Sequence, residues 1–128
     1  MSTHVVDSSA WLEYFADGPN AKRFAAVIEK PAALLVPSIT LLEVFKRISQ
    51  QRDDAMALQC TAVMQQSTVV DLDAAIAIRA ATLGQRHQLP LADSIIYATA
   101  QAAGATVWTQ DADFEGLPGV RFWPRGGA

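Results

Sequence analysis

Acidic side chains stand where two predicted strands end. Asp7 directly follows an apolar strand predicted over 4–6, and Asp111 comes two residues after a strand predicted over 105–109. In an open parallel sheet, ligands bind just outside the carboxyl ends of the strands, so we expect these two carboxylates to lie near one another. Taken singly, each has a simpler interpretation, because Asp7 can cap the following helix and Asp111 can serve a turn.

Asp93 lies in the first turn of a helix that Pro90 is predicted to open. At helical spacing it shares a face with Ile96, Tyr97 and Ala100. The opposite flank of this helix is also apolar, with Leu91, Ile95, Ala98 and Ala102. A carboxylate in such a buried place is costly unless it is paired or binds a metal ion. The alternative is that Asp93 simply favours the positive end of the helix dipole.

Glu43 belongs to a helix predicted over 38–51, whose apolar stripe consists of Leu41, Val44, Phe45 and Ile48. It falls on the other side of that helix, beside Ile39, Lys46 and Arg47. A solvated glutamate paired with Lys46 or Arg47 would account for its position. Because the helix starts just past a strand predicted over 34–36, Glu43 can instead face the same edge of the sheet as the other acids.

Four converging carboxylates would repel one another, and at least one would keep its proton near neutral pH. Divalent cations remove that penalty, and an all-oxygen donor set suits Mg²⁺ or Mn²⁺. Zinc is not indicated, because Cys60 stands alone and His4 and His87 are far apart in the sequence. The expected chemistry is hydrolysis of a phosphodiester bond by metal-activated water, with the catalytic and metal-binding residues Asp7, Glu43, Asp93 and Asp111.

The elements that would position these residues alternate along the chain. Strands are predicted over 4–6, 34–36, 68–70, 105–109 and 120–123. Helices are predicted over 8–15, 20–29, 38–51, 53–66, 73–88 and 90–104, with caps at Ser8 or Ser9, Ser38, Asp53 or Asp54, and Asp73. Apolar strands that alternate with helices indicate βαβ units and a parallel sheet covered on both faces. We therefore expect an α/β fold, a three-layer α/β/α sandwich around a central parallel sheet of four to five strands.

Length and composition fit one domain, predicted over 1–124, followed by a short tail over 125–128. The 10 Lys and Arg against 13 Asp and Glu argue against strong nonspecific nucleic-acid binding, although bound cations or a local basic patch would change the local sign. We expect neither a secretory signal nor a membrane span, because no suitable apolar segment is present. The single cysteine, Cys60, excludes an internal disulfide and fits a reducing compartment such as the cytoplasm.

Four segments of the chain resemble the PIN domain family, and most closely the VapC-type toxins of type II toxin–antitoxin pairs. These segments are VVDSS at 5–9, PSITLLEV at 37–44, LPLADSIIYATAQAAGATVWTQDADF at 89–114 and LPGV at 117–120. Each motif is modest when taken alone, but the four in this order are specific. The likeness covers nearly the whole chain at compatible spacings.

The resemblance implies a PIN-like sandwich, an endoribonuclease that depends on Mg²⁺ or Mn²⁺, a homodimer, and inhibition by a small antitoxin protein. The family's acids fall on Asp7, Glu43, Asp93 and Asp111 of this sequence. Thr109 matches a hydroxyl position that supports the site. Asp113 lies in the same motif as Asp111, and we prefer Asp111 as the fourth acid because it is closer to the strand end, with Asp113 as an assistant.

Several surface positions are candidates for contacts with RNA or with a protein partner. Residues expected to guide RNA phosphates, with ordinary surface charge as the alternative, are Lys46, Arg47 and Arg52. If Ile39 and Leu42 beside Glu43 are exposed in a monomer, a second copy or an antitoxin should cover them. Trp11 could belong to the same surface, and packing in the core explains it equally well.

Two other functions remain open at this point. One is a different Mg²⁺-dependent phosphoryl-transfer enzyme, such as a haloacid-dehalogenase-like phosphatase or a receiver domain. The phosphatase needs a second aspartate two residues after Asp7, where Ser9 stands, and the receiver needs adjacent acids near the first strand. The other alternative is a non-catalytic binding module in which the acids hold a structural cation.

Overall fold

The computed structural model describes residues 2–127 and contains one five-stranded sheet in which all paired neighbours are parallel. The strands are β1 His4–Val6, β2 Leu34–Pro37, β3 Thr68–Val70, β4 Thr106–Thr109 and β5 Val120–Phe122. Their order across the sheet is β3-β2-β1-β4-β5. The chain therefore builds outward from β1 in one direction and then from β4 in the other, so the topological switch point lies between β1 and β4.

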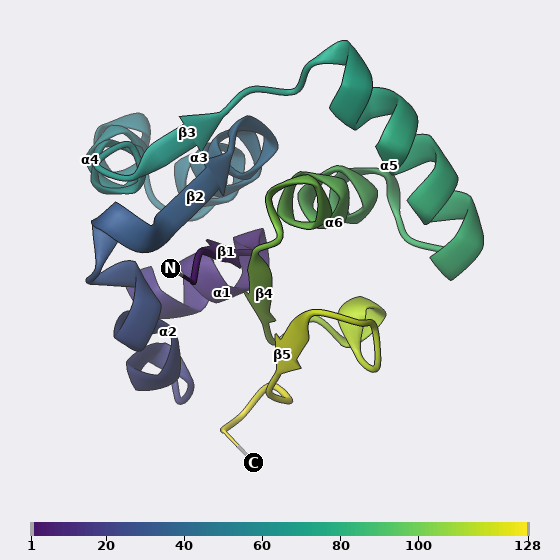
Figure 1. The fold of residues 1–128 in the computed structure, drawn as a ribbon. Coiled ribbons are helices and arrows are strands. Elements are labelled where there is room, and N and C mark those ends of the chain that lie inside the picture. The colour runs from purple at the N-terminus through teal and green to yellow at the C-terminus, as the bar shows by residue number, and fades with distance from the viewer. Residues whose placement is uncertain (1, 128) are drawn as a thin grey trace.

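Helices cover both faces of this sheet (Figure 1). They are α1 Ser8–Phe15, α2 Ala21–Ile28, α3 Ser38–Gln51, α4 Asp54–Met64, α5 Ala74–His87 and α6 Leu91–Ala103, with the short 3₁₀ helices η1 Pro31–Ala33 and η2 Ala112–Phe114. The predicted three-layer α/β/α sandwich is confirmed. Of the helices in residues 2–127, none combines the length and the apolar content that a bilayer crossing requires.

Helix starts follow the predicted caps in two places and differ in two others. Aspartate side chains accept the expected backbone hydrogen bonds at the starts of α4 and α5, from Asp53 and Asp73. At α1 the cap is Asp7, which accepts from the backbone nitrogen of Ala10, so the prediction of Ser8 or Ser9 was wrong. Ser38 is the first residue of α3 rather than its cap. The hydroxyls of Ser8 and Ser9 instead bond to carboxylates.

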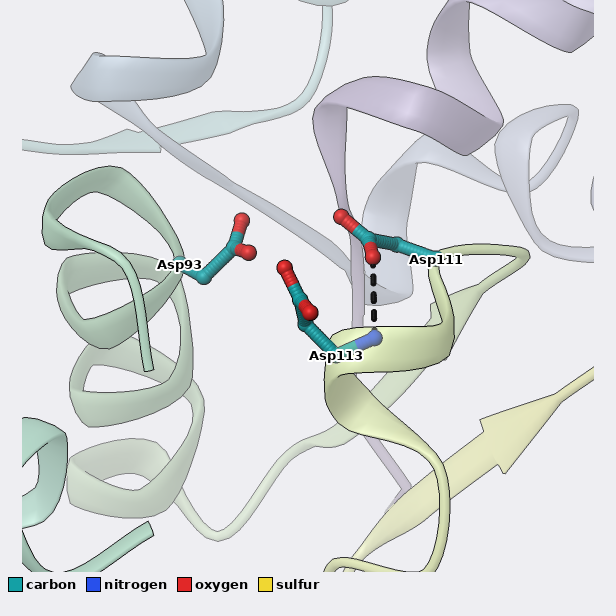
Figure 2. Close-up of side chains that lie close together, drawn as sticks. All are labelled: Asp93, Asp111 and Asp113. Carbon is teal, nitrogen blue, oxygen red and sulfur yellow. Dashed lines mark hydrogen bonds between the residues drawn. The ribbon is translucent and has the colours of Figure 1, made fainter. Parts of the chain in front are cut away.

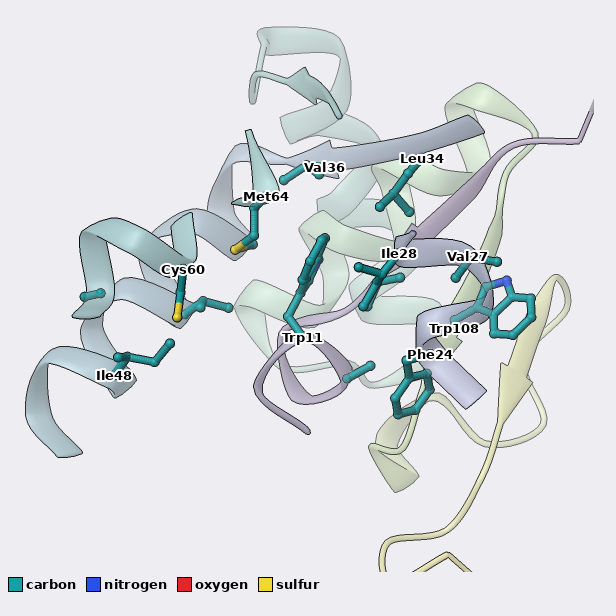
Figure 3. Close-up of a cluster of buried hydrophobic side chains, with 14 residues drawn as sticks. Trp11, Phe24, Val27, Ile28, Leu34, Val36, Ile48, Cys60, Met64 and Trp108 are labelled. Atoms are coloured by element: carbon teal, nitrogen blue, oxygen red, sulfur yellow. The ribbon is translucent and has the colours of Figure 1, made fainter. Parts of the chain in front are cut away.

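The larger core lies between the sheet and helices α1 to α4 (Figure 3). Strand residues Val6, Val36 and Trp108 point into it, because side chains alternate between the two faces of a sheet. Trp11 is fully buried among them, so packing in the core is the interpretation that holds for this residue. Each large apolar side chain buried in this way contributes roughly 1.5–3 kcal/mol. Cys60 is buried in the same core.

The second face of the sheet is covered by α6. Val5 and Val107 point to this side and pack against Ile96 and Tyr97. The middle of α6 is buried without interruption from Ser94 to Ala100, as the apolar sequence predicted. The expected apolar flank is only partly buried, because Leu91 and Ala102 at the two ends of the helix are exposed.

Helix α5 lies outside α6 and covers its outer face (Figure 1). Ile76 and Ala80 pack there against Ile95 and Ala98. At Gly84 the helices approach so closely that an added Cβ would lie 3.0 Å from the Cβ of Ser94. With α5 in place, α6 holds its first turn, which carries Asp93, against the edge of the sheet where β1 and β4 end.

Candidate active site

Carboxylates from separate elements meet at the carboxyl edge of the sheet. Asp7 follows β1, Asp111 follows β4, and Asp93 lies in the first turn of α6. Figure 2 shows the carboxylate of Asp93 pointing from α6 toward those of Asp111 and Asp113 at η2. Each of these three acids offers one oxygen atom, and the three oxygens lie within 4.8 Å of one another.

Asp7 is the buried member of the group, with 1% of its surface exposed. Its Oδ1 accepts hydrogen bonds from the backbone nitrogen of Ala10 at 3.0 Å and from the hydroxyl of Ser9 at 2.9 Å. Burial raises the pKa of Asp7 to about 6, while hydrogen bonds from Ala10, Ser9 and Thr109 oppose that rise and the charge of Asp111 adds to it. Asp7 is therefore a fixed carboxylate that titrates close to neutral pH.

Asp93 feels the charge of every other acid in the group. Its pKa is raised to about 8, first by burial and then by the negative charges of Asp111, Asp7, Asp113 and Glu43. Because charge interactions weaken with distance and with screening by solvent, these four carboxylates must lie near Asp93 to raise its pKa. Of the four acids singled out in the sequence, Asp93 and Asp111 lie in the close group with Asp113. Asp7 and Glu43 are outside that group but near enough for their charges to raise the pKa of Asp93.

Glu43 reaches this region from α3 and is bonded to α1. The hydroxyl of Ser8 donates a 2.6 Å hydrogen bond to Glu43 Oε1. The side chain is half-buried, which is consistent with a position at the rim of the group. Glu43 therefore bonds across to the helix that follows Asp7, whereas the simpler interpretation paired it along its own helix with Lys46 or Arg47.

Thr109 holds the turn that presents the last two acids. It is fully buried, and its hydroxyl oxygen accepts a 2.8 Å hydrogen bond from the backbone nitrogen of Asp111. Asp111 Oδ1 in turn accepts a 2.9 Å hydrogen bond from the backbone nitrogen of Asp113 (Figure 2). Thr109 thus orients Asp111, as expected of a supporting hydroxyl, and Asp111 caps the 3₁₀ helix that carries Asp113.

Three polar residues beside the acids were missed by sequence reasoning. Ser8 and Ser9 were assigned to helix capping, although two hydroxyl residues directly after a strand-end acid are a usable signal. Gln110 gave no comparable signal, because a glutamine between Thr109 and Asp111 reads as an ordinary loop residue. The structure buries Gln110 and bonds its side chain to Asn20, which lies 90 residues earlier in the chain.

A cleft of about 600 Å³ lies next to the acids, between α1, α3, α4 and the C-terminal segment. Ser8, Ser9 and Glu43 form the part of its wall that continues into the acidic group. Three arginines also line it, namely Arg47, Arg52 and Arg125. Two of the three basic residues proposed from the sequence therefore line the cleft, while Lys46 is exposed on α3 but does not contribute to its wall.

The sequence match agrees with this geometry. Residues 4–120 match the family described as the PIN domain. The chain belongs to the PIN domain family. The matched range includes Asp7, Glu43, Asp93 and Asp111 and ends within β5.

Several solved structures resemble the chain over nearly its whole length. A toxin–antitoxin complex from Klebsiella pneumoniae is 26% identical with a TM-score of 0.78, over 93% of this chain and 96% of that one. VapC20 from Mycobacterium tuberculosis, described as a sarcin-ricin loop cleaving toxin, is 20% identical with a TM-score of 0.77, over 92% and 97%. A DNA-bound VapBC from Salmonella typhimurium is 20% identical with a TM-score of 0.73, over 97% and 98%. The last two likenesses show the fold alone. No curated protein matches the sequence.

The donor atoms of this PIN domain suit a hard divalent cation. Asp93, Asp111 and Asp113 supply oxygen ligands only, which Mg²⁺ and Mn²⁺ prefer. Burial and the repulsion of the neighbouring acids together raise the pKa of Asp93, and a bound cation would remove the repulsion. Cys60 is buried in the core, and His4 stands at the start of β1, the opposite end from the acids, so neither supplies a soft ligand here.

Proposed function

We propose that this protein is a metal-dependent endoribonuclease and acts as the toxin of a toxin–antitoxin pair. The observation that carries the proposal is the convergence of acids from β1, α3, α6 and the end of β4 around Asp93, whose pKa responds to all of them. Membership of the PIN domain family supports nuclease chemistry at this group. The catalytic residues would be Asp7, Glu43, Asp93 and Asp111.

Mg²⁺ or Mn²⁺ would be held by Asp7, Asp93 and Asp111, with Glu43 and Asp113 as further oxygen donors. When bound, the cation supplies the positive charge that activates water and stabilises a phosphate oxygen during hydrolysis of the phosphodiester bond. Asp113 is a stronger candidate for a metal ligand than its sequence position indicated, because it lies in the close group with Asp93 and Asp111.

The surrounding residues of the chain hold the acids in place. Ser9 and the backbone of Ala10 fix the carboxylate of Asp7, and Ser8 fixes that of Glu43. A site whose ligands are oriented before the substrate arrives pays less reorganisation during the reaction. These neutral donors also favour the ionised carboxylates, which is the form that binds a cation.

The arginines beside the acids supply the contacts for an RNA strand. Arg47, Arg52 and Arg125 line the cleft that continues from Glu43, and Lys46 lies next to them along α3. Contacts of this kind position a nucleic-acid backbone without reading its sequence. They also compensate locally for a net charge of −3, which by itself disfavours binding to polyanions.

Two protein partners are included in the proposal, a cognate antitoxin and a second copy of the chain. The likeness to the Klebsiella pneumoniae toxin–antitoxin complex supports the antitoxin. Leu42 beside Glu43 is 59% exposed and Leu91 beside Asp93 is 81% exposed, which supports burial of this rim in a homodimer. Trp11 belongs to the core and is not available to either partner. We place the reaction in the cytoplasm, where its RNA substrate is found.

The direct test is incubation of the purified protein with structured RNAs, with and without Mg²⁺ or Mn²⁺, beside Asp7→Asn and Asp93→Asn. We expect cleavage by the wild-type protein but not by either of these two variants, and only with metal. Asp53→Asn is a matched control, because Asp53 is an exposed helix cap on α4 and asparagine caps equally well. Cleavage by Asp7→Asn and Asp93→Asn at the wild-type rate would refute the site. Cleavage in EDTA would refute the metal dependence.

A further inference from the structure

A buried pair of amide side chains lies beside the acidic group. Asn20 is 0% exposed and Gln110 is 4% exposed. Asn20 Nδ2 donates to Gln110 Oε1 at 3.0 Å and to the carbonyl oxygen of Pro124 at 2.9 Å. Both hydrogens of the Asn20 amide are therefore used, while its Oδ1 is buried without a hydrogen-bond partner among the described residues. The pair joins the turn before α2 to the end of β4 and to the C-terminal segment.

The two acceptors fix the direction in which each amide points. Both hydrogens of Asn20 Nδ2 are directed at oxygen atoms, so a reversed Asn20 amide would place its oxygen against two acceptors. Because Gln110 Oε1 faces Asn20, Gln110 Nε2 must face the other way. Its contact there is the carbonyl oxygen of Ser9 at 3.5 Å, which is long for a hydrogen bond. Gln110 Nε2 can therefore still donate a good hydrogen bond, because its one contact with a protein oxygen on that side is long.

That donor lies where a substrate would pass. Gln110 stands between Thr109 and Asp111 in the chain, and its side chain lines the cleft with Ser9 and Glu43. The wall of the same cleft carries the guanidinium groups of Arg47, Arg52 and Arg125. Glu13 and Glu43 also line this cleft, so the three arginines leave an excess of positive charge on its wall. A neutral N–H donor beside that positive charge suits an anionic oxygen atom and favours a phosphate over an uncharged peptide carbonyl.

We propose that Gln110 donates a hydrogen bond to a phosphate oxygen of the RNA next to the acidic group, and that Asn20 is the positioning residue that keeps this donor turned toward the cleft. The inference rests on the proposed function, because it takes RNA as the occupant of the cleft. It adds a substrate contact at a position where the sequence shows only a loop glutamine. Asn20 acts through Gln110 and touches neither the acids nor the substrate.

Kinetics separate this role from a general effect on the fold. Gln110→Met keeps the side-chain length and removes the donor, so we expect KM for a structured RNA to rise about 5- to 20-fold with kcat changed less than about twofold. Gln59→Met is the matched control, because Gln59 is exposed on α4 and is not part of the cleft wall; it should leave KM within about twofold. A fall in kcat at unchanged KM for Gln110→Met would overturn the proposal.

A double-mutant cycle tests the role of Asn20. Asn20→Ala frees the Gln110 amide to reverse, so KM should rise by a smaller factor than in Gln110→Met. In the Gln110→Met background, Asn20→Ala should raise KM no further, because the donor that it positions is already gone. If KM in the double variant rises by the product of the two single-variant factors, Asn20 does not act through Gln110 and the positioning role is overturned. If Asn20→Ala does not fold, the Gln110→Met result still decides the substrate contact.

A binding measurement without cleavage keeps this inference separate from the proposed function. The side-chain amide signals of Gln110 in a ¹⁵N-labelled sample are assigned by their loss in Gln110→Met. We expect them to shift when a ten-nucleotide single-stranded RNA is added in EDTA, and to shift less with Asn20→Ala. Signals that stay fixed while RNA binds would overturn the contact, and signals that move only with a copurified protein would assign the cleft to that partner instead. A shift without any catalytic activity would refute the proposed function alone.

Discussion

The hydroxyl of Ser8 donates to Glu43 Oε1 at 2.6 Å, although the two residues are 35 positions apart in the chain. The neighbouring Ser9 donates to Asp7 at 2.9 Å. Two consecutive serines in the first turn of α1 thus each hold a different acid, one on the strand end before them and one on α3. This arrangement fixes the distance between Asp7 and Glu43 through a single rigid helix turn.

Removing the Ser8 hydroxyl is expected to slow catalysis without unfolding the protein. In Ser8→Ala, Glu43 loses its oriented position, and we expect kcat for RNA cleavage to fall about tenfold, since small displacements at a reacting centre are costly. Ser8→Thr keeps a hydroxyl and should retain most of the activity. Ser67→Ala, in the loop before β3, is the control for loss of a half-buried serine. Equal rates for Ser8→Ala and Ser8→Thr would show that the hydrogen bond has no catalytic role.

The raised pKa values predict that the metal-free protein loses stability as the pH rises. The pKa of Asp93 is about 8 in the folded protein and roughly 3.9 in an unfolded chain. As the pH rises, the unfolded chain loses the Asp93 proton at a lower pH than the folded protein does. The stability that protonated Asp93 contributes is therefore fully present below about pH 4 and is lost as the pH rises through about 8. Asp7, with a pKa of about 6, acts in the same direction at lower pH. In EDTA, Tm should fall by several degrees between pH 5 and pH 8.

The variant Asp93→Asn isolates the contribution of this carboxyl. Asparagine cannot ionise, so the fall in Tm between pH 5 and pH 8 should become smaller, and the variant should be more stable than wild type at pH 8. Thermal unfolding followed by circular dichroism at several pH values measures both effects. If Asp93→Asn keeps the full slope, Asp93 is not the group that titrates.

Added cations should reverse this dependence. Protons and cations compete for the same carboxylates, so Mg²⁺ or Mn²⁺ should raise Tm more at pH 8 than at pH 5.5. Asp111→Asn should lose most of that increase, because it removes one of the clustered oxygen donors. Asp54→Asn, which changes an exposed acid on α4, should keep it. A similar increase in all three proteins would mean that the cations act nonspecifically.

The meeting of Asp7 and Asp111 could be predicted from the sequence, because strand ends in a parallel sheet share one edge. The burial of α6 around Asp93 could be predicted as well, since its apolar residues recur on nearly every side. The partners of these acids could not. The bonds from Ser8 to Glu43 and from Asn20 to Gln110 depend on which helices are neighbours in space, and a single sequence carries no periodic signal for that.

The ends of helices show the same limit in another form. Leu91 looked like part of a buried flank because periodicity reports only which residues share a face of the helix. It does not report how far a covering helix extends, and Leu91, the first residue of α6, is left exposed. Gly84 is a similar case, because its need to be small arises from the approach of Ser94 on the neighbouring helix.

Thr109 links the two halves of the site, so its hydroxyl should influence the pH profile of the reaction. Its hydrogen bond opposes the rise in the pKa of Asp7, and its oxygen accepts from the backbone nitrogen of Asp111. Thr109→Val keeps the shape and removes the hydroxyl. We expect the pKa of Asp7 to rise further, which moves the acidic limb of the kcat/KM profile upward by roughly half to one pH unit, the equivalent of one neutral hydrogen bond.

The control for this shift is Thr106→Val, at the opposite end of β4, which should leave the acidic limb where it is in the wild-type protein. Two results can be told apart. If Thr109→Val lowers kcat/KM by the same factor at every pH, the hydroxyl only orients Asp111 and its effect on Asp7 is negligible. If the limb moves upward and activity recovers at higher pH, Asp7 must be ionised for catalysis, because the added protonation is then the whole cause of the loss. That second outcome is the one we expect, since a buried carboxylate that has lost one of its donors holds its proton more tightly.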